Sequence, residues 1–263
     1  MRNGITGRAL WILMVLMLAP TAAWAVHPFQ VEDTDTQGKG NYLFEVNDDQ
    51  LKAGSSKTTT ETAIITAGIS EFTDIALEVP YLMLNPSPIT GTDASGMGDL
   101  RLKLKYKLNE NEVKQSSGFQ FYTDLPTGDV DKGLGKNNVV MGVTFMDQQE
   151  CHSNVLHVSA GYEVYARDVK RWHYAENYAV TFGFAAEHKF TESFRFLTEL
   201  AGEIRKELLD PATGSQLDQR PFTFMAGFKY DISRSWYIDL AARAGLNKYA
   251  ADQAVLMGTA WRF

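Results

Sequence analysis

Apolar and charged side chains alternate along residues 98–108, whose sequence is GDLRLKLKYKL. Every second position from residue 100 is apolar, and the positions between hold four cations: Arg101, Lys103, Lys105 and Lys107. Successive side chains of a β-strand point to opposite faces, whereas a helix would mix the two sets on every side. The stretch therefore predicts a strand with one apolar face and one cationic face.

The same two-residue period predicts twelve strands between residues 42 and 263. The segments have near the roughly 9–11 residues that a tilted strand needs to cross a bilayer. Short connections such as 70–73 alternate with longer ones rich in Gly, Pro, Asp and Asn, at 85–97, 126–136, 166–177 and 206–220. Two connections of the short set, 109–117 and 147–154, are longer than this scheme expects. An even strand count with short turns at one end and long loops at the other is typical of outer-membrane barrels.

We therefore predict an all-β fold, a transmembrane antiparallel up-and-down β-barrel of twelve strands. A bilayer permits no open sheet edge, so the sheet must close into one domain, here residues 38–263. A secreted soluble β-domain is the alternative, because a sheet with one buried face alternates in the same way. The number, length and connections of the segments favour the membrane barrel.

The amino terminus has the pattern of a secretory signal peptide over residues 1–25. Arg2 and Arg8 make a basic start, residues 9–19 are apolar, and Ala23 and Ala25 form a small-x-small cleavage site. The apolar core is shorter than the about 20 residues that span a bilayer, although an uncleaved anchor is the alternative. Residues 26–37 are polar, and they either fold inward as a plug or extend into the periplasm. We expect the chain in the outer membrane of a Gram-negative bacterium.

Composition narrows the chemistry and the partners. Removing the leader takes away two arginines and no acids, so the formal net charge of -7 becomes -9, and an acidic chain is a poor match for nucleic acid. The single Cys151 cannot form an internal disulfide, and it lies with His152 in an apparent turn without partner residues for a metal site. We expect no cofactor and no metal. The expected partners are outer-membrane lipid, lipopolysaccharide and a small solute.

Aromatic residues gather near the short-turn end of the predicted barrel. This girdle contains Tyr106, Phe119, Phe145, Trp236, Trp261 and Phe263. Rings of aromatic residues are expected at the membrane interfaces of such barrels, whereas in a soluble sandwich they would be core. A terminal Phe263 in register with Trp261 resembles the carboxyl-terminal signal that the barrel-assembly machinery reads.

The charged faces of the predicted strands would line the lumen. The candidate lining and selectivity residues are Arg101, Lys103, Lys105, Lys107, Asp74, Glu78, Asp124, Arg195, Glu199, Glu203, Asp239 and Arg243. Antiparallel neighbours would place Glu78 near Lys103 and Lys105, Asp74 near Lys107, and Asp124 near Arg101. These pairs either stabilise the wall alone or also select the solutes that pass. A lumen of twelve strands should be narrow, because about eight strands leave an interior that side chains fill and about sixteen leave an aqueous channel.

A loop motif follows the strand that ends at Leu125. Pro126 cannot donate to the ladder and ends the strand, and Thr127, Gly128 and Asp129 are turn residues. The whole motif is Pro126, Thr127, Gly128, Asp129, Lys132, Gly133 and Gly135. Its charged residues could form a gate or bind a divalent cation or lipopolysaccharide, or the motif could be a plain surface loop.

Several stretches together resemble a known family. EFTDIALEVPYLML, GMGDLRLKLKYKL and YTDLPTGDVDKGLGKNN follow one another as they do in the outer-membrane proteins of the MetA-pathway of phenol degradation family. The resemblance covers most of the mature chain. It implies an outer-membrane channel or transporter-like barrel, some of whose members occur with aromatic-degradation genes.

Three functions are compatible with these observations. The first is a passive or facilitated pore for a small solute, aromatic or hydrophobic among the options. The second is an outer-membrane enzyme such as a lipid hydrolase, for which His157 beside Ser159 is the one strand-borne candidate pair, without a third partner or a nucleophile motif. The third is a structural or adhesive barrel acting through its loops. The pore is favoured, and no catalytic residue is predicted.

Overall fold

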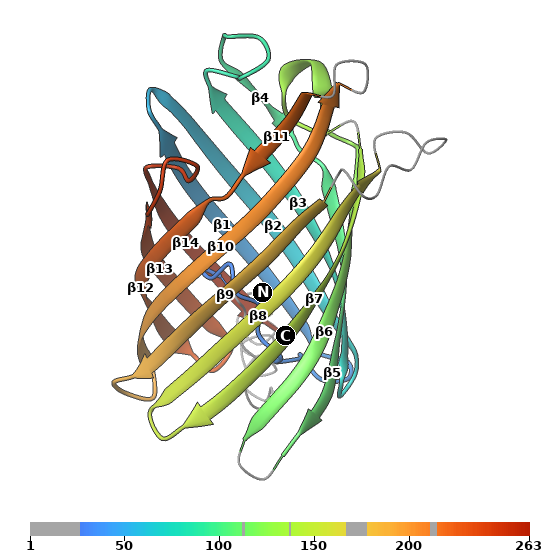
Figure 1. Ribbon diagram of the computed structural model, residues 1–263. Helices are drawn as coiled ribbons and strands as arrows, with labels where there is room; N and C mark the ends of the chain where they lie inside the picture. Colours follow the sequence, from blue (N-terminus) through green and yellow to red (C-terminus); the bar gives the residue numbers. More distant parts are fainter. Residues whose placement is uncertain (1–26, 112–113, 137, 167–177, 211–214) are drawn as a thin grey trace, which may run out of the picture.

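The computed structural model describes residues 27–111, 114–136, 138–166, 178–210 and 215–263. The predicted leader, residues 1–25, and most of the predicted loop 166–177 lie outside this range. Within the described residues the regular structure is β-strand apart from one short 3-10 helix (Figure 1). None of the helical structure there is long and apolar enough to cross a membrane.

Fourteen strands of the described residues form one sheet whose pairings are antiparallel. They are β1 (Tyr42–Ala53), β2 (Ser56–Ser70), β3 (Thr73–Asn85), β4 (Ala94–Met97), β5 (Leu100–Glu110), β6 (Gln115–Leu125), β7 (Val139–Cys151), β8 (Asn154–Ala166), β9 (Tyr178–Lys189), β10 (Phe194–Asp210), β11 (Ser215–Gln219), β12 (Phe222–Ser233), β13 (Trp236–Gly245) and β14 (Gln253–Arg262). The 3-10 helix η1 spans Val130–Lys132 between β6 and β7.

Twelve of these fourteen strands form a closed barrel, which confirms the prediction. The other two, β4 and β11, pair with β3 and β10 and extend hairpins at the long-loop end, the top of Figure 1. Closure comes from β1 and β14, in which Leu43 lies opposite Arg262 and Lys52 lies opposite Gln253. No edge of the ring is therefore left to expose unpaired backbone groups to lipid.

Exposure alternates along the strands in the sense opposite to that of a soluble sheet. In β1, Phe44 and Val46 are 43% and 42% exposed, whereas Glu45 and Asn47 are 7% and 6% exposed. The apolar face points outward and the polar face points into the lumen. A soluble β-domain would bury the apolar face instead, so this alternative is wrong.

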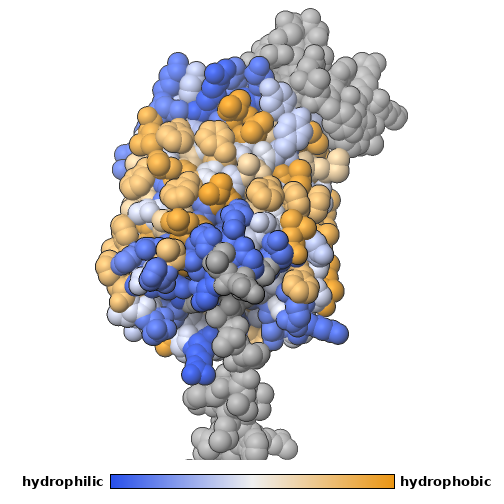
Figure 2. All heavy atoms as spheres, turned by 60° about the horizontal axis from the view of Figure 1, so that its bottom comes forward, coloured by the Kyte–Doolittle hydropathy of each residue, from blue (hydrophilic) through white to orange (hydrophobic). Residues whose placement is uncertain are grey.

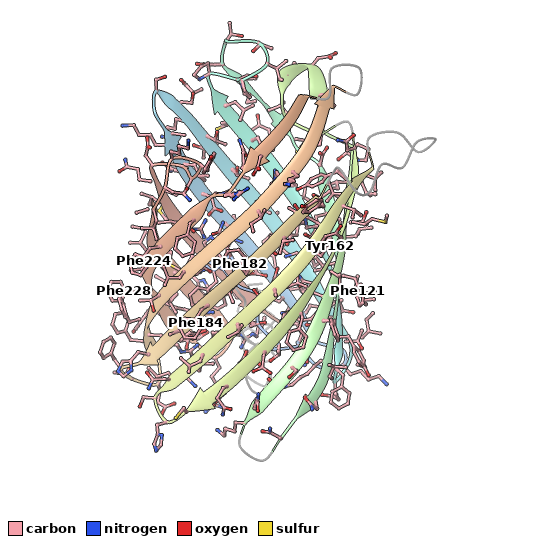
Figure 3. The ribbon with its side chains drawn as sticks, viewed as in Figure 1. Phe121, Tyr162, Phe182, Phe184, Phe224 and Phe228 are labelled. Atoms are coloured by element: carbon pink, nitrogen blue, oxygen red, sulfur yellow. The ribbon has the colours of Figure 1, made fainter. Side chains whose placement is uncertain are left out.

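The outward side chains form a hydrophobic band around the wall. Figure 2 shows hydrophobic side chains along the wall and hydrophilic ones toward both ends of the face in view. Six aromatic side chains labelled in Figure 3 extend from the outside of the wall, and each is at least 40% exposed: Phe121, Tyr162, Phe182, Phe184, Phe224 and Phe228. Lipid contact stabilises such a band by roughly 25 cal/mol per Å² of apolar surface removed from water.

Two sets of connections differ from the sequence prediction. The turns expected to be overlong are short, because β5 runs to Glu110, β6 begins at Gln115, and only residues 152–153 lie between β7 and β8. The loop expected at 206–220 is largely strand, since β10 continues to Asp210 and β11 follows. The prediction counted apolar positions, whereas backbone pairing continues past the apolar band into polar residues at both ends.

Candidate functional site

An amino-terminal segment, residues 27–41, lies inside the barrel and leads to the start of β1 (Figure 1). Val31, Asp33 and Thr34 are only 1%, 4% and 0% exposed. The segment passes so close to β2 that a Cβ atom on Gly68 would lie 1.8 Å from the carbonyl oxygen of Gly38. Glycine at residue 68 therefore allows the segment to turn inward at the end of the barrel where β1 begins.

Side chains of the wall bind the backbone of this segment. Glu199 of β10 accepts hydrogen bonds from the N–H groups of Gln30 and Val31, at 2.5 and 2.9 Å. Other such bonds are Arg243 Nη2 to Pro28 O (3.0 Å), Gln37 N to Asp74 Oδ2 (2.9 Å), Lys105 Nζ to Asp35 O (3.2 Å) and Thr34 N to Gln148 Oε1 (3.4 Å). The segment is thus held as an extended peptide whose buried polar backbone groups have partners in the wall.

The acidic side chains of the segment face the cations of β5. Glu32 Oε1 lies 2.7 Å from Gln120 Nε2 and 3.4 Å from Lys103 Nζ, and Asp33 Oδ1 lies 2.6 Å from Lys105 Nζ. Burial opposes ionisation of Glu32, but Lys103 and Lys105 outweigh it, so the pKa of Glu32 lies below its ordinary value. Glu32 is therefore charged beside Lys103 and Lys105.

The opposite end of the segment carries a cation. His27 Nδ1 lies 2.6 Å from Asp239 Oδ1 on β13, and His27 Nε2 lies 3.1 Å from Asp49 Oδ1 on β1. Burial lowers the pKa of His27, but the hydrogen bonds to Asp239 and Asp49 outweigh burial and raise the pKa to about 9. At neutral pH the imidazolium and the acids of the segment therefore bind oppositely charged parts of the wall.

The cationic strand lies beside the acidic residues that the sequence indicated, in a different register. Arg101 Nε lies 2.5 Å from Asp124 Oδ1, and Glu78 forms an ion pair with Lys103, as expected. Asp74, however, lies opposite Lys105 rather than Lys107. A shift of two residues leaves every side chain on the same face, so alternation alone does not determine this register.

The other predicted lumen residues also lie on the inner wall. Arg195 and Glu199 are each 2% exposed; Arg195 binds Asp231 at 2.9 Å, and Arg243 Nη2 lies 3.8 Å from Glu199 Oε1. Glu203 pairs with Arg205 two residues further along β10. These contacts join both charge signs into a network around the segment, and selection of solutes by this network remains a prediction.

Two chambers flank the segment inside the barrel. One has a volume of about 410 Å³ and is lined by β1, β2, β3 and β5, including Lys103, Lys105 and Asp49. The other has a volume of about 270 Å³ and is lined on the opposite side by Tyr122, Glu163 and Arg205, among others. Gln30, Glu32 and Arg101 line both chambers, so the segment and one wall cation separate them.

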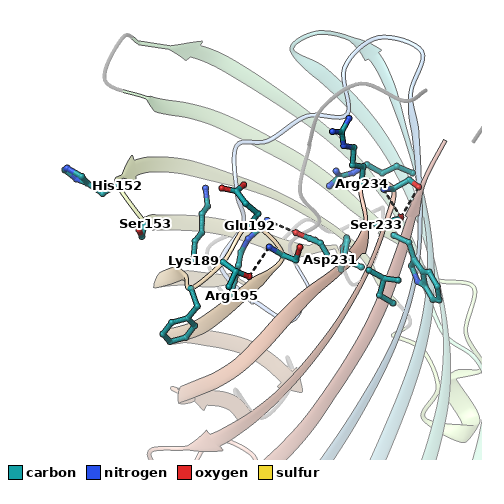
Figure 4. Close-up of a pocket in the computed structure, with 16 residues that line it drawn as sticks. His152, Ser153, Lys189, Glu192, Arg195, Asp231, Ser233 and Arg234 are labelled. Carbon is teal, nitrogen blue, oxygen red and sulfur yellow. Dashed lines mark hydrogen bonds and ion pairs between the residues drawn. The ribbon is translucent and has the colours of Figure 1, made fainter. Parts of the chain in front are cut away.

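A third cavity of about 980 Å³ opens at the short-turn end, shown in Figure 4. Its lining includes Lys189 at the end of β9 and the turn residues Glu192 and Arg234. Arg195 and Asp231, joined by a dashed line in Figure 4, belong to its lining. This vestibule gives the short-turn end of the lumen a mouth of mixed charge.

The loop motif after β6 is folded against the barrel rim. Asp99 accepts hydrogen bonds from the N–H groups of Gly128 (2.9 Å) and Lys136 (2.7 Å). Asp129 caps η1 and forms an ion pair with Lys132 at 2.8 Å, and Gly133 ends η1 at a φ of 75°. The same loop contains Pro126, Thr127 and Gly135. Thr127 Oγ1 donates a hydrogen bond to Gly98 O at 3.1 Å, and Gly135 lies against Gly128. The charged residues of the motif thus pair with each other, and a gating or ligand-binding role is still a prediction.

The predicted girdle residues lie outside the barrel near the short turns. Trp236 stacks on Trp261 with ring centroids 5.8 Å apart, and Phe119 meets Phe145 edge-on at 5.4 Å. Tyr106 is 46% exposed. Phe263 stacks on Tyr42 across the closing seam, and its backbone N–H and C=O both bond to Tyr42. Recognition of Phe263 by an assembly machinery remains a prediction.

Sequence reasoning missed several residues of the lumen. Gln120, Gln148 and Lys229 are buried on inner faces, and Glu32 and Asp33 come from the segment itself. The first three could have been found from the sequence, because they occupy strand positions whose side chains alternate toward the lumen. The segment has no periodic pattern that would have indicated Glu32 and Asp33.

The candidate enzyme residue His157 belongs to the same charged wall. It is buried, with Nε2 3.3 Å from Glu187 Oε1, and its ring lies 5.7 Å from that of Phe29 in the segment. These contacts join a wall strand to a neighbouring strand and to the segment.

Comparison with known proteins gives one family and several solved structures. The family described as "Putative MetA-pathway of phenol degradation" matches residues 27–263. An outer membrane channel from Pseudomonas putida has a TM-score of 0.68 at 13% identity, covering 89% of this chain and all (100%) of the other. No curated protein matches the sequence.

Two porin structures are also similar. The NanC porin has a TM-score of 0.58 at 8% identity, covering 83% of this chain and 98% of its own. The KdgM porin in complex with disordered oligogalacturonate has a TM-score of 0.54 at 12% identity, and the match covers 84% of this chain and 99% of the porin chain. At these identities the likeness establishes a shared barrel fold. Neither the matching family nor these structures are described as enzymes.

Proposed function

The chain belongs to the Putative MetA-pathway of phenol degradation family, and we propose that it is an outer-membrane channel whose lumen is closed by its own amino-terminal segment. The observation that carries this proposal is the placement of the segment inside the barrel, where its Gln30 and Glu32 lie between two charged chambers. The hydrophobic band around the wall supports a position in the lipid of the outer membrane. Displacement of the segment joins the chambers and opens a path for small solutes.

The side chains that line the lumen favour polar solutes over the aromatic or hydrophobic solutes that the sequence analysis named among the options. The larger chamber is bounded by Arg101, Lys103 and Lys105 on β5 and by Glu45 and Asp49 on β1. An apolar solute would displace water from these charges without replacing its hydrogen bonds, which is unfavourable. Charged solutes find partners of both signs along the same path.

Planar-bilayer recordings test closure by the segment. A variant lacking residues 27–37 keeps all strands of the barrel, and we expect it to conduct in steps while the full chain is mostly silent. Lys103→Glu with Lys105→Glu should change the ion selectivity of the open variant. A folded deletion variant, recognised by a gel mobility that changes on boiling, that passes no more current than the full chain would overturn the proposal.

A covalent lock supplies a matched control in the full chain. A Cβ atom on Gly183 would lie 2.4 Å from Val31 Cγ2, so Val31→Cys with Gly183→Cys places two thiols in reach of each other. The exposed native Cys151 is replaced by Ser in every variant to prevent wrong pairing. Conditions that open the full chain should leave the oxidised lock closed, and a reductant should restore opening.

A further inference from the structure

The contacts of the segment also indicate what kind of solute the lumen takes. We propose that the lumen binds short acidic peptides in an extended conformation, and that the amino-terminal segment occupies their site as a resident competitor. This inference rests on the proposed channel function and names its solute class. Its ground is that the wall binds backbone groups of the segment, which every peptide has, together with two adjacent carboxylates.

Backbone recognition is the first part of this site. Glu199 binds two consecutive N–H groups of the segment, Asp74 binds a third, and Arg243 and Lys105 donate to two carbonyl oxygens. Glu199 is 2% exposed, and it therefore needs such donors to remain buried as a charge. Backbone N–H and C=O groups are the same in any peptide, so these wall groups select a peptide without selecting a sequence.

Adjacent carboxylates form the second part. Glu32 and Asp33 are consecutive, and they reach Lys103 and Lys105, which are two positions apart on one face of β5. Gln120 Nε2 completes the cradle at 2.7 Å from Glu32 Oε1. A peptide with two neighbouring acidic residues presents the same pair of carboxylates to the same donors.

Access to the cradle is the third part. The 410 Å³ chamber is lined by Lys103, Lys105 and Gln120 while the segment is in place. The acids Glu45 and Asp49 line the same chamber. There they can receive the cationic amino end of a peptide, as Asp49 receives His27. An entering peptide can therefore contact part of the site before the segment leaves, and complete its contacts as the segment is displaced.

The test uses block of the KCl current through the variant lacking residues 27–37. Three hexapeptides are compared: one with the sequence of residues 29–34, one with Gln and Asn in place of its two acids, and one of unrelated acidic sequence, Gly-Ser-Leu-Glu-Asp-Ser. We expect both acidic peptides to block, with half-blocking concentrations at least about tenfold below that of the amide peptide. Lys103→Gln with Lys105→Gln should raise these concentrations about tenfold or more.

Arg205→Gln is the matched control, because it removes one lumen cation that lines the other chamber and should leave the block unchanged. Boiling-dependent gel mobility establishes that each variant is folded. Passage is measured as entry of the dye-labelled acidic peptide into liposomes that contain the open variant.

If only the peptide with the sequence of residues 29–34 blocks the current, and the unrelated acidic peptide does not, the inference is overturned, because the lumen then recognises only its own segment. Block that ignores the lysine substitutions, or that is equal for the amide peptide, would overturn it as well. The conductance of the deletion variant is read before any peptide is added. A conducting variant that no peptide blocks would therefore refute the peptide site while leaving the channel intact.

Discussion

Glu199 is the side chain on which closure can be tested most directly. Its carboxylate accepts two backbone hydrogen bonds from the segment, at 2.5 and 2.9 Å, and it is 2% exposed. Glu199→Gln keeps the size of the side chain and one acceptor oxygen but removes the charge. We therefore expect the substitution to weaken the docking of the segment without leaving a cavity in the wall.

The magnitude follows from the two bonds. A hydrogen bond to a charged group contributes about 1.5–3 kcal/mol, and a neutral one contributes about 0.5–1.5 kcal/mol. Loss of charge on two bonds therefore costs roughly 2 kcal/mol of docking free energy, since each bond loses about 1 kcal/mol. Because 1.4 kcal/mol corresponds to a factor of ten, the ratio of open to closed channels should rise roughly 30-fold.

Current through membranes that hold many channels measures this ratio. Glu203→Gln is the control, since Glu203 lies on the same strand and pairs with Arg205 in the wall. We expect the control to keep the current of the unchanged chain. An unchanged current for Glu199→Gln, with a conducting deletion variant, would show that these bonds do not hold the segment in place.

Three further predictions concern pH, the lipid face and the outer loop. The pKa of His27 is raised to about 9 from an ordinary 6.5, so docking should be strongest below about pH 6.5 and weaken as pH rises through 9. Current should therefore increase between pH 7 and 10, and His27→Gln should abolish that increase; a decrease would contradict the sign. Leu104→Lys places a charge on the 41% exposed lipid face and should lower the free energy of unfolding in lipid vesicles by about 2–4 kcal/mol, whereas Leu104→Met should change it little. Asp99→Ala removes the carboxylate that accepts hydrogen bonds from two backbone N–H groups of the 126–136 loop, and it should make that loop sensitive to protease with the current unchanged. Equal protease resistance of the variant and the unchanged chain would refute the role of Asp99.

Strand positions and their faces were predictable because the solvent on each side differs. Lipid requires apolar side chains at every second position, and the lumen accepts charge at the positions between, so the stretch at Leu100–Glu110 reveals both faces by itself. The ends of the strands were less predictable. Polar residues such as Glu110 continue the ladder where no apolar pattern marks them.

Register and the choice of ion pairs could not be predicted in the same way. Glu78 and Lys103 were expected to meet and do, yet Asp74 lies opposite Lys105 instead of Lys107. Both registers bury the same charges, because a shift of two residues preserves the faces. Register depends on the connection between the paired strands, and β3 and β5 are joined by residues 86–99, which include β4.

Sequence alone thus determined a closed barrel with an apolar outside and a charged inside, because alternation is a local property that each strand shows separately. It left open whether the polar residues before β1 enter the lumen. Their partners, among them Glu199, Asp239 and Lys105, come from strands far apart in the chain. Only the curvature of the closed sheet brings those three side chains around one segment, so closure of the lumen is a property of the assembled barrel.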